Sequence, residues 1–133
     1  GNYMEELTGD DARSALVLML GIPNSPANRY FQVKRARVEN NTLVDCKYSI
    51  LIGLGDDDDA TLPPVESQFE GNQALSPRRA IVDARCALDG IAWRDNRFAG
   101  KTLGISEVPG ISTADPRITP LPPISRTEVG TTW

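Results

Sequence analysis

The sequence contains no histidine among its 133 residues. Histidine titrates near neutral pH and is the commonest zinc ligand, so its absence excludes Ser-His and Cys-His catalytic pairs and the usual zinc sites. Catalysis would have to use carboxylates, lysine, tyrosine or cysteine, and no arrangement of these residues forms a recognisable catalytic site. We therefore predict no catalytic residue and no cofactor, and the sequence favours a protein that is not an enzyme.

Cysteine is scarce as well. The two cysteines, Cys46 and Cys86, are too few for a disulfide framework or a zinc cluster. Either one can serve as a small apolar core residue, and the sequence leaves open whether the two form a disulfide.

Long apolar runs and an excess of positive charge are also missing. No segment is long and apolar enough to span a bilayer, and the acidic start over residues 1–6 lacks the basic region of a secretion signal. The 14 Lys and Arg residues are outnumbered by 18 Asp and Glu, so the net charge is -4 and gives no general attraction to phosphates or anionic membranes. We expect a soluble protein, cytoplasmic or part of a virion, with no membrane partner, and nucleic acid is disfavoured as a partner.

Two segments carry the signals of helix starts. The stretch Thr8-Gly-Asp-Asp resembles a capping box before an apolar run, which predicts a helix over residues 10–20. Ser76 followed by Pro77 matches an N-cap and a first helical position, which predicts a second helix over residues 77–89.

Strand signals lie between and after these helices. From Val44 to Leu54 apolar residues alternate with polar ones and glycine, the pattern of a strand with one buried face. We predict that this strand forms a hairpin with residues 29–38, in one of two registers that the sequence does not separate. A smaller hairpin is predicted over residues 91–98.

The chain changes in composition after residue 102. Residues 103–133 hold five of the ten prolines, which excludes a long helix or a central strand, yet apolar residues recur among them. Because such an arm becomes ordered by docking, we predict one α+β domain over 1–102, a small antiparallel sheet covered by two helices, with an extended proline-rich C-terminal arm. The apolar candidates for docking contacts in the arm are Ile111, Ile118, Leu121, Ile124 and Trp133.

Four consecutive aspartates, Asp56–Asp59, follow the predicted strand. Their spacing fails the calcium loop of an EF-hand, and consecutive residues of an extended chain point to opposite sides, so Asp56 and Asp58 are only weak metal candidates. Mutual repulsion favours an exposed, hydrated loop. The acidic loop could also pair, through Asp57, with the basic residues Arg29, Arg35 and Arg37 of a neighbouring subunit.

These features favour a structural or assembly subunit of an oligomeric particle, such as a minor capsid, cementing or head-tail protein of a phage or virus. In this hypothesis the arm docks on another copy of the chain or on a protein partner. One alternative is a monomeric protein that binds a metal or small ligand through residues 56–59. Another is an accessory protein that binds single-stranded nucleic acid through Tyr30, Phe31, Arg35 and Arg37.

Overall fold

The computed structural model describes residues 1–114, 116 and 118, and their regular secondary structure consists of β-strands joined by turns and loops, with a single short helical turn. The strands are β1 Tyr3–Glu5, β2 Leu16–Met19, β3 Arg37–Glu39, β4 Thr42–Val44, β5 Ile50–Leu54, β6 Ser67–Glu70, β7 Gln73–Ala80, β8 Val82–Ala84, β9 Ile91–Arg94, β10 Asn96–Thr102 and β11 Ile111–Ser112. The helical turn is the 3-10 element η1 Asp11–Arg13.

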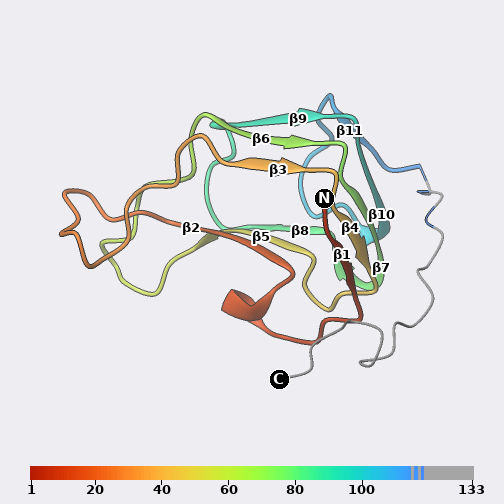
Figure 1. Ribbon diagram of the computed structural model, residues 1–133, viewed down its shortest axis with the longest axis horizontal. Helices are drawn as coiled ribbons and strands as arrows, with labels where there is room; N and C mark the ends of the chain where they lie inside the picture. Colours follow the sequence, from red (N-terminus) through yellow and green to blue (C-terminus); the bar gives the residue numbers. More distant parts are fainter. Residues whose placement is uncertain (115, 117, 119–133) are drawn as a thin grey trace, which may run out of the picture.

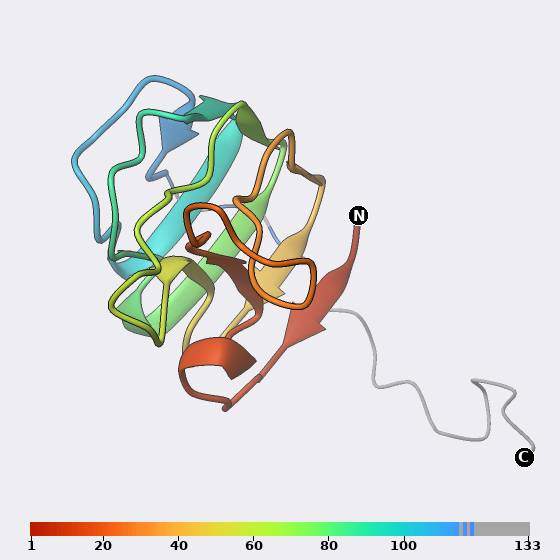
Figure 2. The same cartoon turned by 90° about the vertical axis from the view of Figure 1, so that its left-hand side faces the viewer.

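The strands belong to three sheets, and every pairing between them is parallel. Sheet A has the order β1-β4-β7-β10-β11, sheet B the order β2-β5-β8, and sheet C the order β3-β6-β9. Through β10 the chain visits the sheets in the repeating order A, B, C, so each set of three strands makes one coil stacked on the last (Figures 1 and 2). This architecture is a parallel β-helix.

The core consists of apolar side chains stacked in register from coil to coil. Inside sheet A the stack contains Leu43, Ala74 and Phe98; inside sheet B it contains Leu16, Ile50 and Val82; inside sheet C it contains Val38, Phe69 and Trp93. The rings of Phe69 and Trp93 lie 4.8 Å apart between centroids, and Trp93 meets Phe98 edge-on at 6.3 Å. Because a coil cannot bury its apolar face alone, this stacking stabilises the whole fold.

A ladder of asparagines runs along the corner between sheets C and A. The backbone N–H and the side-chain amide of Asn2 both donate to Oδ1 of Asn41, at 3.0 and 2.9 Å. Asn41 donates in the same way to Asn72, at 3.0 Å in both bonds, and Asn72 to Asn96, at 3.1 and 3.0 Å. Asn41, Asn72 and Asn96 are buried, so the ladder gives these polar groups the partners that burial requires.

The residue before each of the last three ladder asparagines has a left-handed backbone. Asn40, Gly71 and Asp95 have φ angles of 55°, 65° and 51°. Glycine adopts this conformation without a steric penalty, and Asn and Asp tolerate it better than other residues. The sequence therefore supplies a suitable residue for the same sharp turn in each coil.

The predicted α+β fold with two helices is wrong. Residues 10–20 form η1 and then β2, because the apolar run at Leu16–Met19 fits a buried strand as well as a helix, and pairing with β5 decides for the strand. Residues 77–89 form the end of β7 and then β8. Pro77, which was predicted to be the first residue of a helix, lies instead in β7 where the register against β10 shifts.

The predicted antiparallel hairpins are also absent from the described part of the chain. The alternating segment 44–54 contains the end of β4 and all of β5, which belong to different sheets. The segment 91–98 turns a corner at Asn96 from sheet C into sheet A. The alternation predicted one buried face, but every residue of β5 is buried, and the partners of these strands come from other coils.

Part of the predicted arm is described. Strand β11 continues sheet A through β10, Ile111 packs against the core, and Ile118 is half-buried. Leu121, Ile124 and Trp133 lie outside the described residues. In the part of the chain that the structure describes, no helix has the length and apolar character needed to cross a bilayer.

The ladder yields a stability prediction. Replacing Asn72 by alanine removes the acceptor of two N–H groups of Asn41 and the donor to Asn96 and Val38, all in the interior. We expect Asn72→Ala to lower the free energy of unfolding by roughly 2–4 kcal/mol, measured by urea denaturation of the full chain. The exposed turn residue Asn28 is the control, because Asn28→Ala should change stability by less than about 0.5 kcal/mol. Equal effects of the two substitutions would contradict the role of the ladder.

Candidate functional site

Two long loops leave the β-helix at one corner. Residues 20–36 connect β2 to β3, and residues 55–66 connect β5 to β6, so both run from sheet B to sheet C. The next coil makes the same connection with only residues 85–90. The two long loops lie side by side and project from the stacked coils at the left of Figure 1. We call them together the loop arm.

Backbone hydrogen bonds hold the two loops of the arm against each other. The N–H of Gly21 donates to the carbonyl of Leu62 at 2.8 Å, and the N–H of Leu62 donates back to Gly21 at 2.9 Å. Nearer to sheet C, the N–H of Val65 donates to Val33 at 3.0 Å. A Cβ atom at Gly21 would lie 2.4 Å from the Cα of Gln32, so the fold of the first loop requires glycine there.

A charged contact adds to these bonds. Arg29 of the first loop lies 2.5 Å from an oxygen of Asp57 and 3.5 Å from one of Asp59, both in the second loop. The three side chains are 38%, 49% and 55% exposed, so solvent screens the contact and its contribution to stability is small. The sequence predicted that Asp57 pairs with Arg29 of a neighbouring subunit, whereas in the structure the two residues pair within one chain.

Asp56 and Asp58 are exposed and make no salt bridge among the described residues. The two aspartates that converge on one partner are Asp57 and Asp59, which are two residues apart. Over residues 1–114, 116 and 118, no group of three or more His, Cys, Asp or Glu side chains is placed to hold a metal ion.

The first loop exposes two neighbouring aromatic side chains. Tyr30 is 49% exposed and Phe31 is 63% exposed, although the carbonyl of Tyr30 is fixed by a hydrogen bond from the N–H of Ile22 at 2.9 Å. Large apolar side chains held in the solvent by an ordered backbone are typical of a surface that contacts a ligand.

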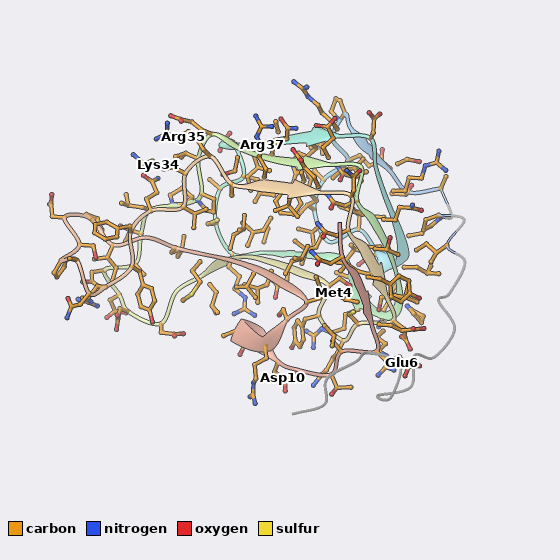
Figure 3. The ribbon with its side chains drawn as sticks, in the orientation of Figure 1. Met4, Glu6, Asp10, Lys34, Arg35 and Arg37 are labelled. Atoms are coloured by element: carbon orange, nitrogen blue, oxygen red, sulfur yellow. The ribbon has the colours of Figure 1, made fainter. Side chains whose placement is uncertain are left out.

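Three cations follow these aromatic residues along the chain. Figure 3 shows Lys34, Arg35 and Arg37 together where the first loop enters β3. Arg35 approaches Glu66 only to 4.0 Å, and Arg37 approaches Glu39 only to 3.7 Å. The two arginine side chains are 81% and 76% exposed, so both guanidinium groups can still bind an anion.

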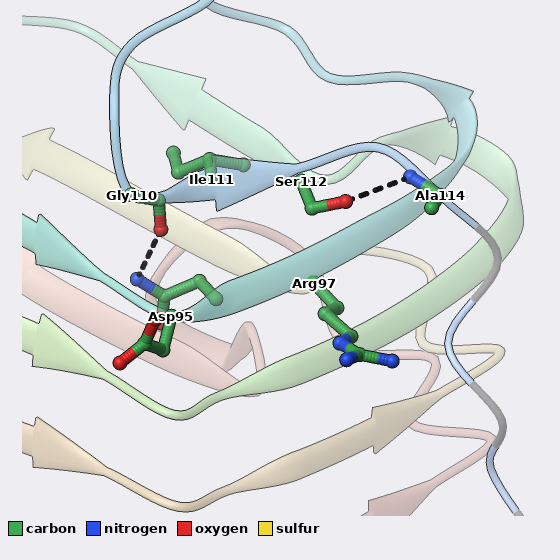
Figure 4. A pocket seen from close by; sticks show the side chains of 7 residues that line it. Asp95, Arg97, Gly110, Ile111, Ser112 and Ala114 are labelled. Carbon is green, nitrogen blue, oxygen red and sulfur yellow. Dashed lines mark hydrogen bonds between the residues drawn. The ribbon is translucent and has the colours of Figure 1, made fainter.

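A separate pocket of about 600 Å³ lies at the corner of the last ladder asparagine (Figure 4). Its lining includes Arg97, Ile111 and Ser112. Backbone bonds organise it, since the N–H of Asn96 donates to the carbonyl of Gly110 at 2.9 Å. The charged residues in its lining are one acid, Asp95, and one base, Arg97, so this pocket has less charge than the loop arm.

Comparison with known proteins shows which family the chain belongs to. Residues 1–130 match the family described as chondroitinase B. The chain belongs to the chondroitinase B family. Two solved structures agree in fold: the PL6 family alginate lyase AlyGC matches with a TM-score of 0.76 and a point mutant of AlyGC with 0.75, each at 34% sequence identity. No curated protein matches the chain.

The match covers 85% of this chain and 15% of each alginate lyase chain, so this chain spans about 15% of the length of the solved structures that it matches. The hypothesis of a phage or virus virion protein is wrong, because a polysaccharide lyase family accounts for nearly the whole sequence. That hypothesis rested on the composition of residues 103–133, and composition did not reveal that Ile111–Ser112 form a strand that continues sheet A.

Sequence reasoning missed an internal repeat. Asn2, Asn41, Asn72 and Asn96 are each followed, two residues later, by an apolar residue whose side chain packs in or against the core of sheet A. The signal is short and its spacing varies, since the intervals are 39, 31 and 24 residues (41−2, 72−41 and 96−72). A search for repeats before the assignment of single elements would have favoured a β-helix.

The contact between the two loops can be tested with a double-mutant cycle. We expect Arg29→Ala and Asp57→Ala to show a coupling energy of about 0.2–1 kcal/mol at low salt that disappears at high salt, because exposed pairs are weak and screened. The measurement is urea denaturation of the full chain. The matched control is the cycle of Arg29→Ala with Asp56→Ala, which should show no coupling. A coupling of the same size in both cycles would rule out a specific pair.

Proposed function

We propose that this chain is part of a polysaccharide lyase that acts on an acidic polysaccharide, and that the loop arm binds the polymer. The family and the solved neighbours are described as acting on chondroitin and on alginate, which are both acidic polysaccharides. We therefore propose an acidic polysaccharide as the ligand class for this chain and name no particular polymer.

The observation that carries the proposal is the exposed pair Tyr30 and Phe31, followed within six residues of the chain by the exposed cations Lys34, Arg35 and Arg37. The faces of sugar rings present C–H groups, which pack on aromatic rings. The carboxylate or sulfate groups of an acidic polymer match the fork of a guanidinium group and the charge of an ammonium group. One short segment therefore offers partners for both chemical features of the polymer.

The acidic residues of the arm determine which side the polymer can use. Asp56–Asp59 would repel an anionic chain, and Arg29 compensates this charge only in part through Asp57 and Asp59. The polymer therefore follows the end of the first loop and the start of β3, where Lys34, Arg35 and Arg37 lie (Figure 3). The acidic loop then acts as a boundary that rejects anionic groups placed on the wrong side.

The role proposed for the loop arm is binding and positioning. A lyase breaks its bond by elimination, which requires a base and a group that stabilises the developing charge. We assign neither group to the residues of the arm. They hold the polymer by contacts that extend along several sugar units, and such contacts orient the reacting unit elsewhere in the lyase.

Binding by the arm is testable in solution. We expect the full chain to bind alginate or chondroitin sulfate oligosaccharides, measured by calorimetry, and to show no binding to neutral dextran. Tyr30→Ala with Phe31→Ala should weaken binding at least tenfold, because the aromatic contact is lost while all charges remain. The control is Leu7→Ala, since Leu7 is an exposed apolar residue outside the arm, 39% exposed.

A second pair of variants tests the charges. Arg35→Gln with Arg37→Gln should weaken binding about tenfold at low salt and less at high salt, since screening removes the charge contribution. Arg94→Gln with Arg97→Gln removes the same charge from exposed positions outside the arm and should leave affinity within twofold. Equal binding to dextran, or equal losses in the two charge variants, would overturn the proposed function.

A further inference from the structure

A second pocket, lined by several charged residues, lies at a different corner of the β-helix, between sheets A and B. Its volume is about 570 Å³. The lining residues are Tyr48, Arg78, Arg79, Ala80, Val82, Asp83, Ala84, Lys101, Thr102 and Gly104. None of these residues belongs to the loop arm, so the pocket is a separate feature of the molecule.

An irregularity of sheet A builds this pocket. Ser76 of β7 pairs with Gly100 of β10, and Ala80 pairs with Thr102, so three residues of β7 lie opposite the single residue Lys101. The three residues, Pro77, Arg78 and Arg79, are all exposed. Bulges of this kind re-aim side chains and occur preferentially beside functional sites. Here the bulge places two arginines next to a lysine from the neighbouring coil.

Asp83 in the pocket lining and Asp45 beside Arg78 already have partners. Arg78 binds Asp45 through two nitrogens, at 2.7 and 3.0 Å, and this hydrogen bonding lowers the pKa of Asp45. Asp83 accepts from Arg85 at 3.0 Å. These acids are therefore not available to neutralise a further cation, and one of the two arginines of the bulge is already paired.

Two cations of the pocket remain for a ligand. Among the described residues, neither Arg79 nor Lys101 forms a salt bridge. Asp10 is close enough to Arg79 for their charges to interact, but its carboxylate forms a salt bridge with Lys47 at 2.5 Å. The guanidinium of Arg79 lies over the ring of Tyr48, 4.1 Å from its centroid. This stacking limits the rotamers of Arg79 and so reduces the entropy that ligand binding would cost.

We propose that this pocket binds the carboxylate of a uronic acid unit, with Arg79 and Lys101 holding the anionic group and the hydroxyl of Thr102 contacting a sugar hydroxyl. The proposal rests on the proposed function, because the uronic acid is a unit of the same acidic polysaccharide. It adds a second binding site at a corner that the loop arm does not reach. A polymer held at both sites would gain affinity through the higher effective concentration at the second site.

The test uses nuclear magnetic resonance of the isotopically labelled full chain. Titration with monomeric glucuronate should shift the backbone amide signals of Lys101, Thr102 and Gly104, and titration with glucose or with inorganic sulfate at equal ionic strength should shift them much less. We expect Arg79→Gln with Lys101→Gln to weaken glucuronate binding about tenfold. The charge-matched control, Arg94→Gln with Arg97→Gln, lies outside the pocket lining and should change affinity by less than twofold.

The outcomes separate this site from the loop arm. Loss of the shifts in the pocket variant, with retention in the control and in the Tyr30→Ala and Phe31→Ala variant, supports the proposal. Unchanged binding in the pocket variant, equal weakening in the control, or equal shifts with sulfate would overturn it, while polymer binding through the loop arm would stand. Failure of the full chain to bind any acidic oligosaccharide would instead overturn the proposed function. Thermal unfolding of each variant checks that it is folded.

Discussion

The structure depends on a single repeated hydrogen bond pattern, in which Asn41, Asn72 and Asn96 each accept two N–H groups from the ladder asparagine one coil before. This pattern fixes the distance and register between coils at the corner of sheets C and A. Because the amides are buried, a slip between coils would leave several polar groups without partners. The apolar stacks of all three sheets then follow the register that the ladder sets, so polar bonding and core packing specify the same alignment.

Because the asparagine ladder fixes the corner between sheets C and A, the connections at the other two corners can differ in length from coil to coil. Between sheets B and C, two coils insert the long loops 20–36 and 55–66, and between sheets A and B, strand β7 bulges at residues 77–79. The inner stacks stay aligned, because the register shifts lie at the ends of the strand pairs, at Leu18–Met19 of β2 and at Gly100–Thr102 of β10, beyond the stacked core residues. Both features with a proposed ligand therefore lie on segments that the core does not constrain, supported by a rigid set of parallel strands.

Sequence reasoning succeeded for local properties and failed for pairing. The segment from Val44 to Leu54 does contain a core strand, but the alternation failed to show that β5 is buried on both faces, while the aspartates at 56–59 lie exposed as expected. The apolar run at Leu16–Met19 was assigned to a helix because a buried strand and a buried helix segment share the same composition. In the candidate site, Tyr30, Phe31, Arg35 and Arg37 were selected as aromatic and basic residues that could bind single-stranded nucleic acid. The contact that joins their loop to residues 55–66 involves backbone groups that sequence patterns do not reveal.

The sequence by itself determined what chemistry is available: no histidine, few cysteines, an acidic net charge and apolar residues at the positions that become buried. Only the tertiary structure decided that successive strands belong to different sheets, that Ser76-Pro77 lies in a bulge, and that Arg79 and Lys101 lie in one pocket. The reason is physical. Each coil contains too little apolar surface to be stable alone, so its conformation is chosen by the coils stacked on it, through contacts between residues 20 to 40 positions apart that local propensity does not encode.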